Sequence, residues 1–103
     1  MNFRVIILAL TLGFASTSAI ADPMDRGILA FLKGDTYTAL QVFRPLADSG
    51  NKEAQYHLGY MYQTGTGVVQ SPAEAMKWYQ LAAKQGHRSA SVQVRVVART
   101  LKN

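Results

Sequence analysis

The sequence has no cysteine, which excludes disulfide bonds, thiolate nucleophiles, cysteine-ligated zinc and iron–sulfur sites, and lipid attachment through cysteine. Histidine and carboxylate side chains are also scarce, with two and six in 103 residues, and leave little material for a metal site or an acid–base pair. With 49% apolar and 17% charged residues, the composition is typical of one small globular domain, not of a disordered chain or a multidomain enzyme.

The N-terminal segment has the layout of a secretory signal peptide. The basic stretch Met1–Arg4 precedes the apolar run Val5–Ala15, and small residues then lead to Ala21. An uncleaved membrane anchor is the alternative, but a helix over this run would span only about 17 Å of a hydrocarbon core about 30 Å thick. We therefore expect a signal peptide over residues 1–21, cleavage after Ala21, and export to the periplasm or the cell exterior.

An internal repeat with a 36-residue period follows. Ala39–Gly50 aligns with Ala75–Gly86, and the same shift carries Ala54 to Ala90. A period in this range is typical of helical solenoids. The sequence therefore predicts an all-α fold over residues 22–103, a short α-α solenoid of about two and a half antiparallel helix pairs. We expect repeat units at about 22–50 and 51–86 and a half unit at 87–103.

Capping signals and apolar spacing place the helices. Ser71, followed by proline at the first helical position and by Glu74, satisfies the free N–H groups of a helix start, and Gly86 ends that helix. The last segment alternates from Val92 to Val96 as a strand would, but its repeat position and its apolar stripe favour a helix. The expected helices run over about 23–33, from a cap at Asp35 to Gly50, over 51–63, from Ser71 to Gly86, and over 88–101.

The spaced residues of the second unit closely resemble the Sel-one-like repeat, a relative of the tetratricopeptide repeat. The matching positions are Ala54, Leu58, Gly59, Met61, Tyr62, Gly65, Gly67 and Val68, then Ala75, Trp78, Tyr79, Ala82, Ala83 and Gly86. The resemblance implies helix pairs stacked into a curved superhelix that binds or scaffolds other proteins. In the last helix Arg95 replaces the glycine of the pattern, as expected where no further helix has to approach closely.

No catalytic set of residues emerges from the motifs. The Gly65–Val68 segment lacks the Gly-Lys-Ser/Thr of a phosphate loop and is interpreted as a turn between helices. His57 and His87 lie 30 positions apart without a local acidic partner, so neither a metal site nor a general base is predicted. We expect no enzymatic activity and no cofactor.

Exposed aromatic residues are the first candidate binding site. On the helix over 51–63, Tyr56, Tyr60 and Gln63 lie opposite the stripe that contains Leu58. First helices of repeat units line the concave surface of a solenoid, where tyrosine is a good peptide anchor. The alternative is that these side chains only pack between adjacent units. Trp78 and Tyr79 are assigned to the core.

Basic residues on the last helix are the second candidate. Arg88, Arg95, Arg99 and Lys102 fall on one sector of that helix. They form either a solvated face near the helix C-terminus or a docking strip, centred on Arg95 and Arg99, for an acidic surface or anionic lipid. Export argues against nucleic acid as a partner.

The resulting hypothesis is an exported, non-catalytic protein-interaction module that binds a partner protein or peptide through its concave helical surface. A small envelope hydrolase, or a regulator of an envelope enzyme, is one alternative. A structural homo-oligomer is another, because fewer than three full repeats leave terminal surfaces uncovered.

Overall fold

The structure is a computed structural model that describes residues 22–103, and the predicted signal peptide lies outside them. Every regular element in this range is an α-helix, which confirms the predicted all-α class. The segment that alternates from Val92 to Val96 lies inside the last helix, as its repeat position predicted. The helices are α2 (Pro23–Leu32), α3 (Thr36–Asp48), α4 (Lys52–Thr64), α5 (Pro72–Lys84) and α6 (Arg88–Lys102).

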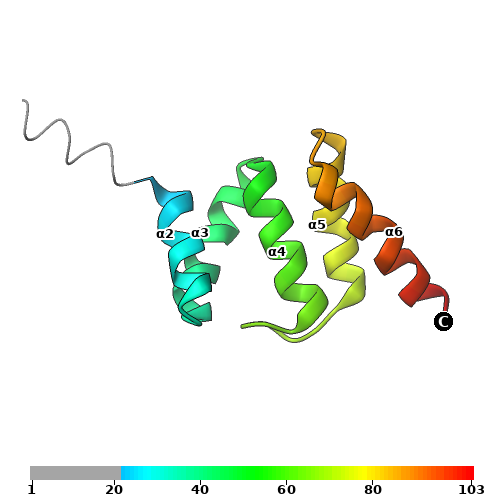
Figure 1. The fold of residues 1–103 in the computed structure, drawn as a ribbon, viewed down its shortest axis with the longest axis horizontal. Helices are drawn as coiled ribbons and strands as arrows, with labels where there is room; N and C mark the ends of the chain where they lie inside the picture. The colour runs from blue at the N-terminus through cyan, green and yellow to red at the C-terminus, as the bar shows by residue number, and fades with distance from the viewer. Residues whose placement is uncertain (1–21) are drawn as a thin grey trace, which may run out of the picture.

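The helices follow one another across the molecule in chain order, with α2 and α6 at opposite ends (Figure 1). Each helix packs against the next one, and α4 also contacts α6, the first helix of the following unit. The core is correspondingly divided into two clusters. One lies between α2, α3 and α4 and contains Phe43 and Leu58. The other has its buried residues, among them Tyr79 and Val97, on α5 and α6, with Tyr56 of α4 packed against them. Stacking of neighbour on neighbour is the arrangement of a solenoid.

Helix starts obey the 36-residue period. The Asp35 and Ser71 side chains cap α3 and α5 by accepting from the amides three residues later, at 3.1 and 3.2 Å. Asn51 caps α4 in the same way at 3.0 Å, and His87 caps α6 with its imidazole at 3.2 Å. The predicted caps at Asp35 and Ser71 are confirmed. The cap at His87 was not predicted, although the period carries Asn51 onto it.

Two glycines let the two helices of a unit approach each other closely. A Cβ on Gly59 would lie 2.8 Å from Cδ1 of Tyr79, and one on Gly27 would lie 2.7 Å from Cε1 of Phe43. Phe43 and Tyr79 are 36 residues apart, so both glycines have the same role in successive units. The alignment of the chain with itself at a 36-residue shift missed Gly27. The link between α2 and α3 is shorter than the link between α4 and α5, so Gly27 does not lie 36 residues before Gly59.

The core predictions hold for Tyr79, which is fully buried, and for Trp78, which is half-buried and packs on the first cluster. Gly65 and Gly67, both at positive φ, lie in the link from α4 to α5. The segment is therefore a turn between helices, as the sequence indicated.

Candidate functional site

Tyr60 is the exposed aromatic residue of α4. Its side chain is 40% exposed, and its ring meets Phe31 of α2 edge to face with centroids 5.8 Å apart. The period carries Tyr60 to Val96 and Tyr56 to Val92 on α6, and these valines are also exposed. We call the surface formed by Phe31, Tyr60, Val92 and Val96 the first-helix face, because its members come from the first helix of each unit.

His57 lies beneath this face and joins α4 to the first unit. Its imidazole stacks on the Phe43 ring at 4.9 Å between centroids, with 8° between the ring planes. Burial lowers the pKa of His57, the Glu53 carboxylate opposes this shift, and His87 adds to it. The neutral imidazole is therefore the form that the fold favours, and it packs as an aromatic ring.

Tyr56 takes a different position from Tyr60. It is half-buried, and its ring stacks on the His87 imidazole with centroids 4.5 Å apart and 18° between the planes. It also lies within 5.8 Å of the Tyr79 ring, centroid to centroid. The stacking on His87 is packing between units, the alternative that sequence reasoning kept open for both tyrosines, and the contact with Tyr79 is packing within the unit.

Gln63 is engaged within the fold. Its side-chain Oε1 accepts a 2.6 Å hydrogen bond from the Tyr79 hydroxyl, and its backbone carbonyl accepts one of 2.8 Å from Gln70. Burial raises the pKa of Tyr79, with Tyr56 and Tyr60 contributing, so the hydroxyl stays protonated and donates to Gln63. Of the three residues predicted on α4, Tyr60 alone combines an exposed ring with no side-chain hydrogen bond.

A contact between Glu53 and His87 is the feature that sequence reasoning missed. Nε2 of His87 lies 3.1 Å from Glu53 Oε1, while Nδ1 accepts from the Ala90 amide. A neutral ring with its proton on Nε2 satisfies both partners, so neither nitrogen is free to act as a base. The pair fastens the start of α6 to α4. Among residues 22–103, no three histidine or acidic side chains come together as metal ligands.

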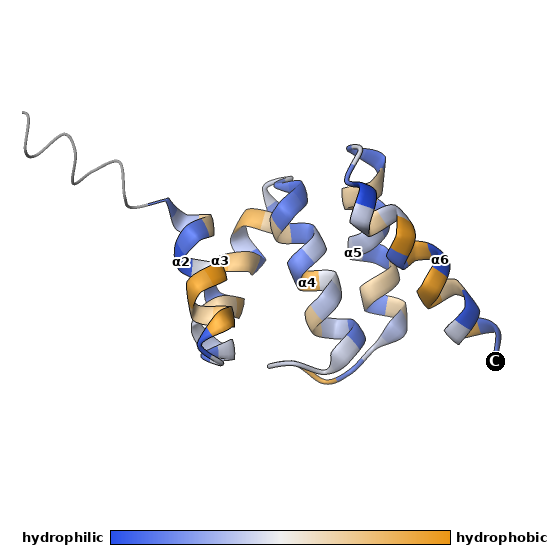
Figure 2. Cartoon of the chain, viewed as in Figure 1, coloured by the Kyte–Doolittle hydropathy of each residue, from blue (hydrophilic) through white to orange (hydrophobic). Residues whose placement is uncertain are grey.

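Arg95 and Arg99 are exposed on α6, and neither forms an ion pair with any residue of the described range 22–103. They belong to a wider imbalance of charge. Residues 75–103 contain six cationic side chains and no carboxylate side chain, whereas all six carboxylates of the sequence precede them. The cationic residues are Lys77, Lys84, Arg88, Arg95, Arg99 and Lys102. On α6 hydrophobic segments alternate with hydrophilic ones along the helix, as its colouring shows (Figure 2).

Comparison with known proteins assigns the central unit to a repeat family. The family model described as the Sel1 repeat matches residues 52–87, which run from the start of α4 to the His87 cap. This segment is a Sel1 repeat. It contains Tyr60 and the contact between Gly59 and Tyr79, whereas Arg95 and Arg99 lie beyond it.

Curated relatives share the repeat region. The chain is 33% identical over 63 residues to DAP3-binding cell death enhancer 1 of Rattus norvegicus and 39% identical over 63 residues to that of Mus musculus. Each match covers 61% of this chain and 12% of the relative. Chitin synthase regulatory factor 3 of Schizosaccharomyces pombe is 46% identical over 44 residues, which are 43% of this chain and 5% of that protein. The chain thus spans a small fraction of the length of these relatives. No solved structure gives a significant match.

None of the described helices combines the length and the apolar character needed to cross a bilayer. This finding concerns α2 to α6 only.

Proposed function

We propose that the chain is a non-catalytic protein-interaction module that binds a peptide segment of a partner protein on its first-helix face, with Tyr60 as the anchor. Sel1-repeat proteins are generally protein-interaction scaffolds. The names of the relatives describe binding to DAP3 and regulation of chitin synthase, which supports a role of the same kind here.

The observation that carries this proposal is the recurrence of exposed apolar side chains on the first helices of successive units. Phe31 and Tyr60 touch across two units, and Val96 repeats the position of Tyr60 on the third first helix. Tyr60 and Val96 are 40% and 41% exposed, although other apolar residues of their helices are fully buried. Exposed apolar rows of this kind are typical of protein-binding surfaces, and partly buried tyrosine is a frequent energetic anchor.

A photo-crosslinking amino acid placed at Tyr60 is expected to form a covalent adduct with the partner in cells that produce the chain. Leu81 of α5 provides a matched control, because it is 42% exposed but belongs to the second helix of its unit. With the partner identified from the adduct, Tyr60→Ala is expected to weaken binding at least tenfold, which corresponds to about 1.4 kcal/mol.

The affinity is to be measured by titration calorimetry beside the melting temperature of each variant, because Tyr60 also touches Phe31. Adducts at Leu81 and none at Tyr60, or unchanged affinity in a folded Tyr60→Ala variant, would contradict the proposal. A homo-oligomer would be recognised by adducts whose mass is twice that of the chain.

We also propose export after removal of residues 1–21, on the sequence pattern of this segment. The mature chain should then begin at Asp22, and N-terminal sequencing of the protein from the cell envelope or medium checks this. An intact Met1 terminus in the membrane fraction would instead identify an anchor.

A further inference from the structure

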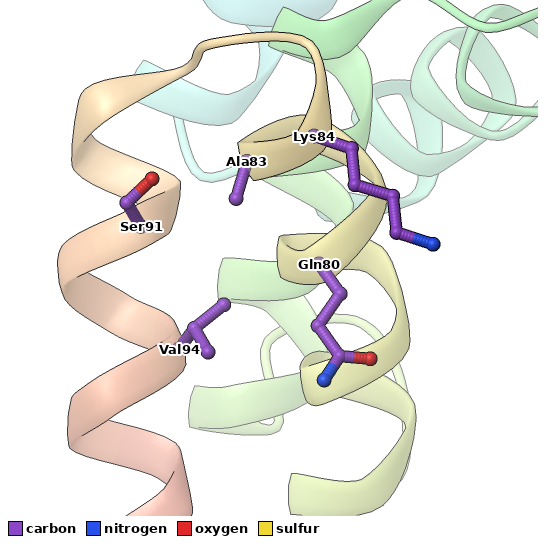
Figure 3. Close-up of a pocket in the computed structure, with 5 residues that line it drawn as sticks. All are labelled: Gln80, Ala83, Lys84, Ser91 and Val94. Carbon is purple, nitrogen blue, oxygen red and sulfur yellow. The ribbon is translucent and has the colours of Figure 1, made fainter.

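An open groove of about 480 Å³ lies between α5 and α6, at the C-terminal end of the row of helices. Its small and aliphatic lining residues are half-buried, whereas Gln80 and Lys84 are exposed. In Figure 3 Val94 and Ser91 extend from α6 into the space beside Ala83, while the Lys84 chain points away from it. The lining residues are Gln80, Ala83, Lys84, Ser91 and Val94.

The same groove exists one repeat earlier, where it is filled. The 36-residue shift carries Ala83 to Ala47 of α3, and carries Ser91 and Val94 to Gln55 and Leu58 of α4. Leu58 is fully buried and Gln55 is 4% exposed. Ser91 and Val94 are only half-buried.

A helix closes the earlier groove. Gln85, the residue that ends α5, donates to Oε1 of Gln55 at 2.9 Å and to the carbonyl of Gly50 at 2.9 Å. Trp78 of α5 packs on the cluster that holds Leu58. The period therefore places a helix, in the position of α5, over the groove between α5 and α6.

Arg95 defines the chemistry of that helix. Arg95 occupies the position that Gly59 has one repeat earlier, where the Tyr79 ring packs. A residue of an incoming helix at the position equivalent to Tyr79 would therefore meet the arginine side chain. Residues 75–103 carry no carboxylate side chain, and neither Lys84 nor Arg95 forms an ion pair with any of residues 22–103. A carboxylate from the incoming helix would supply the missing charge.

The charge also argues against a symmetric pair of copies. Joining two α6 faces would bring Arg95 and Arg99 of one copy against cations of the other, since the whole segment has a single sign of charge.

We propose that this groove docks an amphipathic helix of a partner protein, with small aliphatic residues on Ala83 and Val94 and a carboxylate on Arg95. None of the residues that line this groove belongs to the first-helix face, and the groove binds its helix whether or not Tyr60 binds a peptide. The docked helix packs on α6 as α5 packs on α4.

The chain itself provides the probe. It is a stapled peptide with the sequence of residues 71–86, which is α5 with its cap. If this peptide docks on α6 as α5 docks on α4, its position 79 faces Arg95. Its helicity is verified by circular dichroism before use. Two forms are compared, the unchanged sequence and Tyr79→Glu, each labelled for fluorescence anisotropy against the full chain. The Tyr79→Glu form is expected to bind at least tenfold more tightly, and its affinity should fall as salt is raised.

Protein variants test the position. Arg95→Gly should reverse the preference and favour the peptide that keeps tyrosine, and Ala83→Phe should fill the groove and weaken both peptides at least tenfold. Lys33→Glu makes a charge change at the end of α2, at the opposite end of the row of helices from α6, and Tyr60→Ala alters only the first-helix face, so both should leave the affinity within twofold. All variants are checked for helical content and melting temperature.

Three outcomes would overturn the proposal: no binding of either helical peptide, equal binding of both, or binding that Arg95→Gly leaves unchanged. Sedimentation of the chain alone tests whether a second copy of the chain occupies the groove. Self-association that Ala83→Phe abolishes would assign the groove to a second copy and would also overturn the proposal. None of these results bears on crosslinking at Tyr60, so the two proposals fail separately.

Discussion

Replacing Tyr79 by alanine is expected to lower the free energy of unfolding by about 3–5 kcal/mol. The ring is fully buried, lies against Gly59 and Tyr56, and donates its hydroxyl proton to Gln63. Its removal leaves a large cavity where α5 joins α4. A domain of this size has a total stability of roughly 4–12 kcal/mol, so the variant should be largely unfolded at elevated temperature.

Urea titration followed by circular dichroism measures this loss, and Tyr79→Phe is the matched control. The control keeps the ring and removes only the hydroxyl, so it should cost about 0.5–1.5 kcal/mol. A loss in the alanine variant no larger than that in the phenylalanine variant would show that the hydrogen bond to Gln63, and not ring packing, holds α5 on α4.

The order and bounds of the helices follow from local signals in the sequence. Asp35 and Ser71 each supply a side-chain oxygen to an amide three residues later, and this cap requires only contacts within one turn. The period decided the one ambiguous segment. Val92 to Val96 alternate as a strand would, but Ala90 and Val97 correspond to Ala54 and Met61, which are buried on a helix in the preceding unit.

The positions of the candidate site residues follow less directly. A helical wheel places Tyr56, Tyr60 and Gln63 on one face, but it does not state what the following unit brings near each of them. His87 reaches Tyr56 and Glu53 from the turn before α6, and Tyr79 reaches Gln63 from α5. These contacts join residues that are far apart in the sequence. The sequence alone therefore could not separate the exposed Tyr60 from its two engaged neighbours.

Placing valine at Gly59 is expected to lower the free energy of unfolding by about 1–3 kcal/mol, although valine is the better helix former of the two residues. A Cβ alone would lie 2.8 to 3.1 Å from three ring atoms of Tyr79, including Cγ at the base of the ring. The ring has little room to withdraw because its hydroxyl is fixed to Gln63 at 2.6 Å. Either the Tyr79 side chain leaves its rotamer or α5 moves away from α4.

Arg95→Val is the matched control, since the same residue is placed at the equivalent position one repeat later. Arg95 is exposed and no helix of residues 22–103 covers it, so this change should alter stability by about 0.5 kcal/mol or less. Thermal melts of both variants give the comparison. Equal losses would mean that α6 is covered at this position in solution, whereas a neutral Gly59→Val would mean that α5 can shift on α4 without cost. The expected difference requires a tight approach of helices inside the Sel1 repeat and an open position at the end of the solenoid. An acidic helix that binds the groove should reduce this difference, because bound partner makes Arg95→Val costly as well.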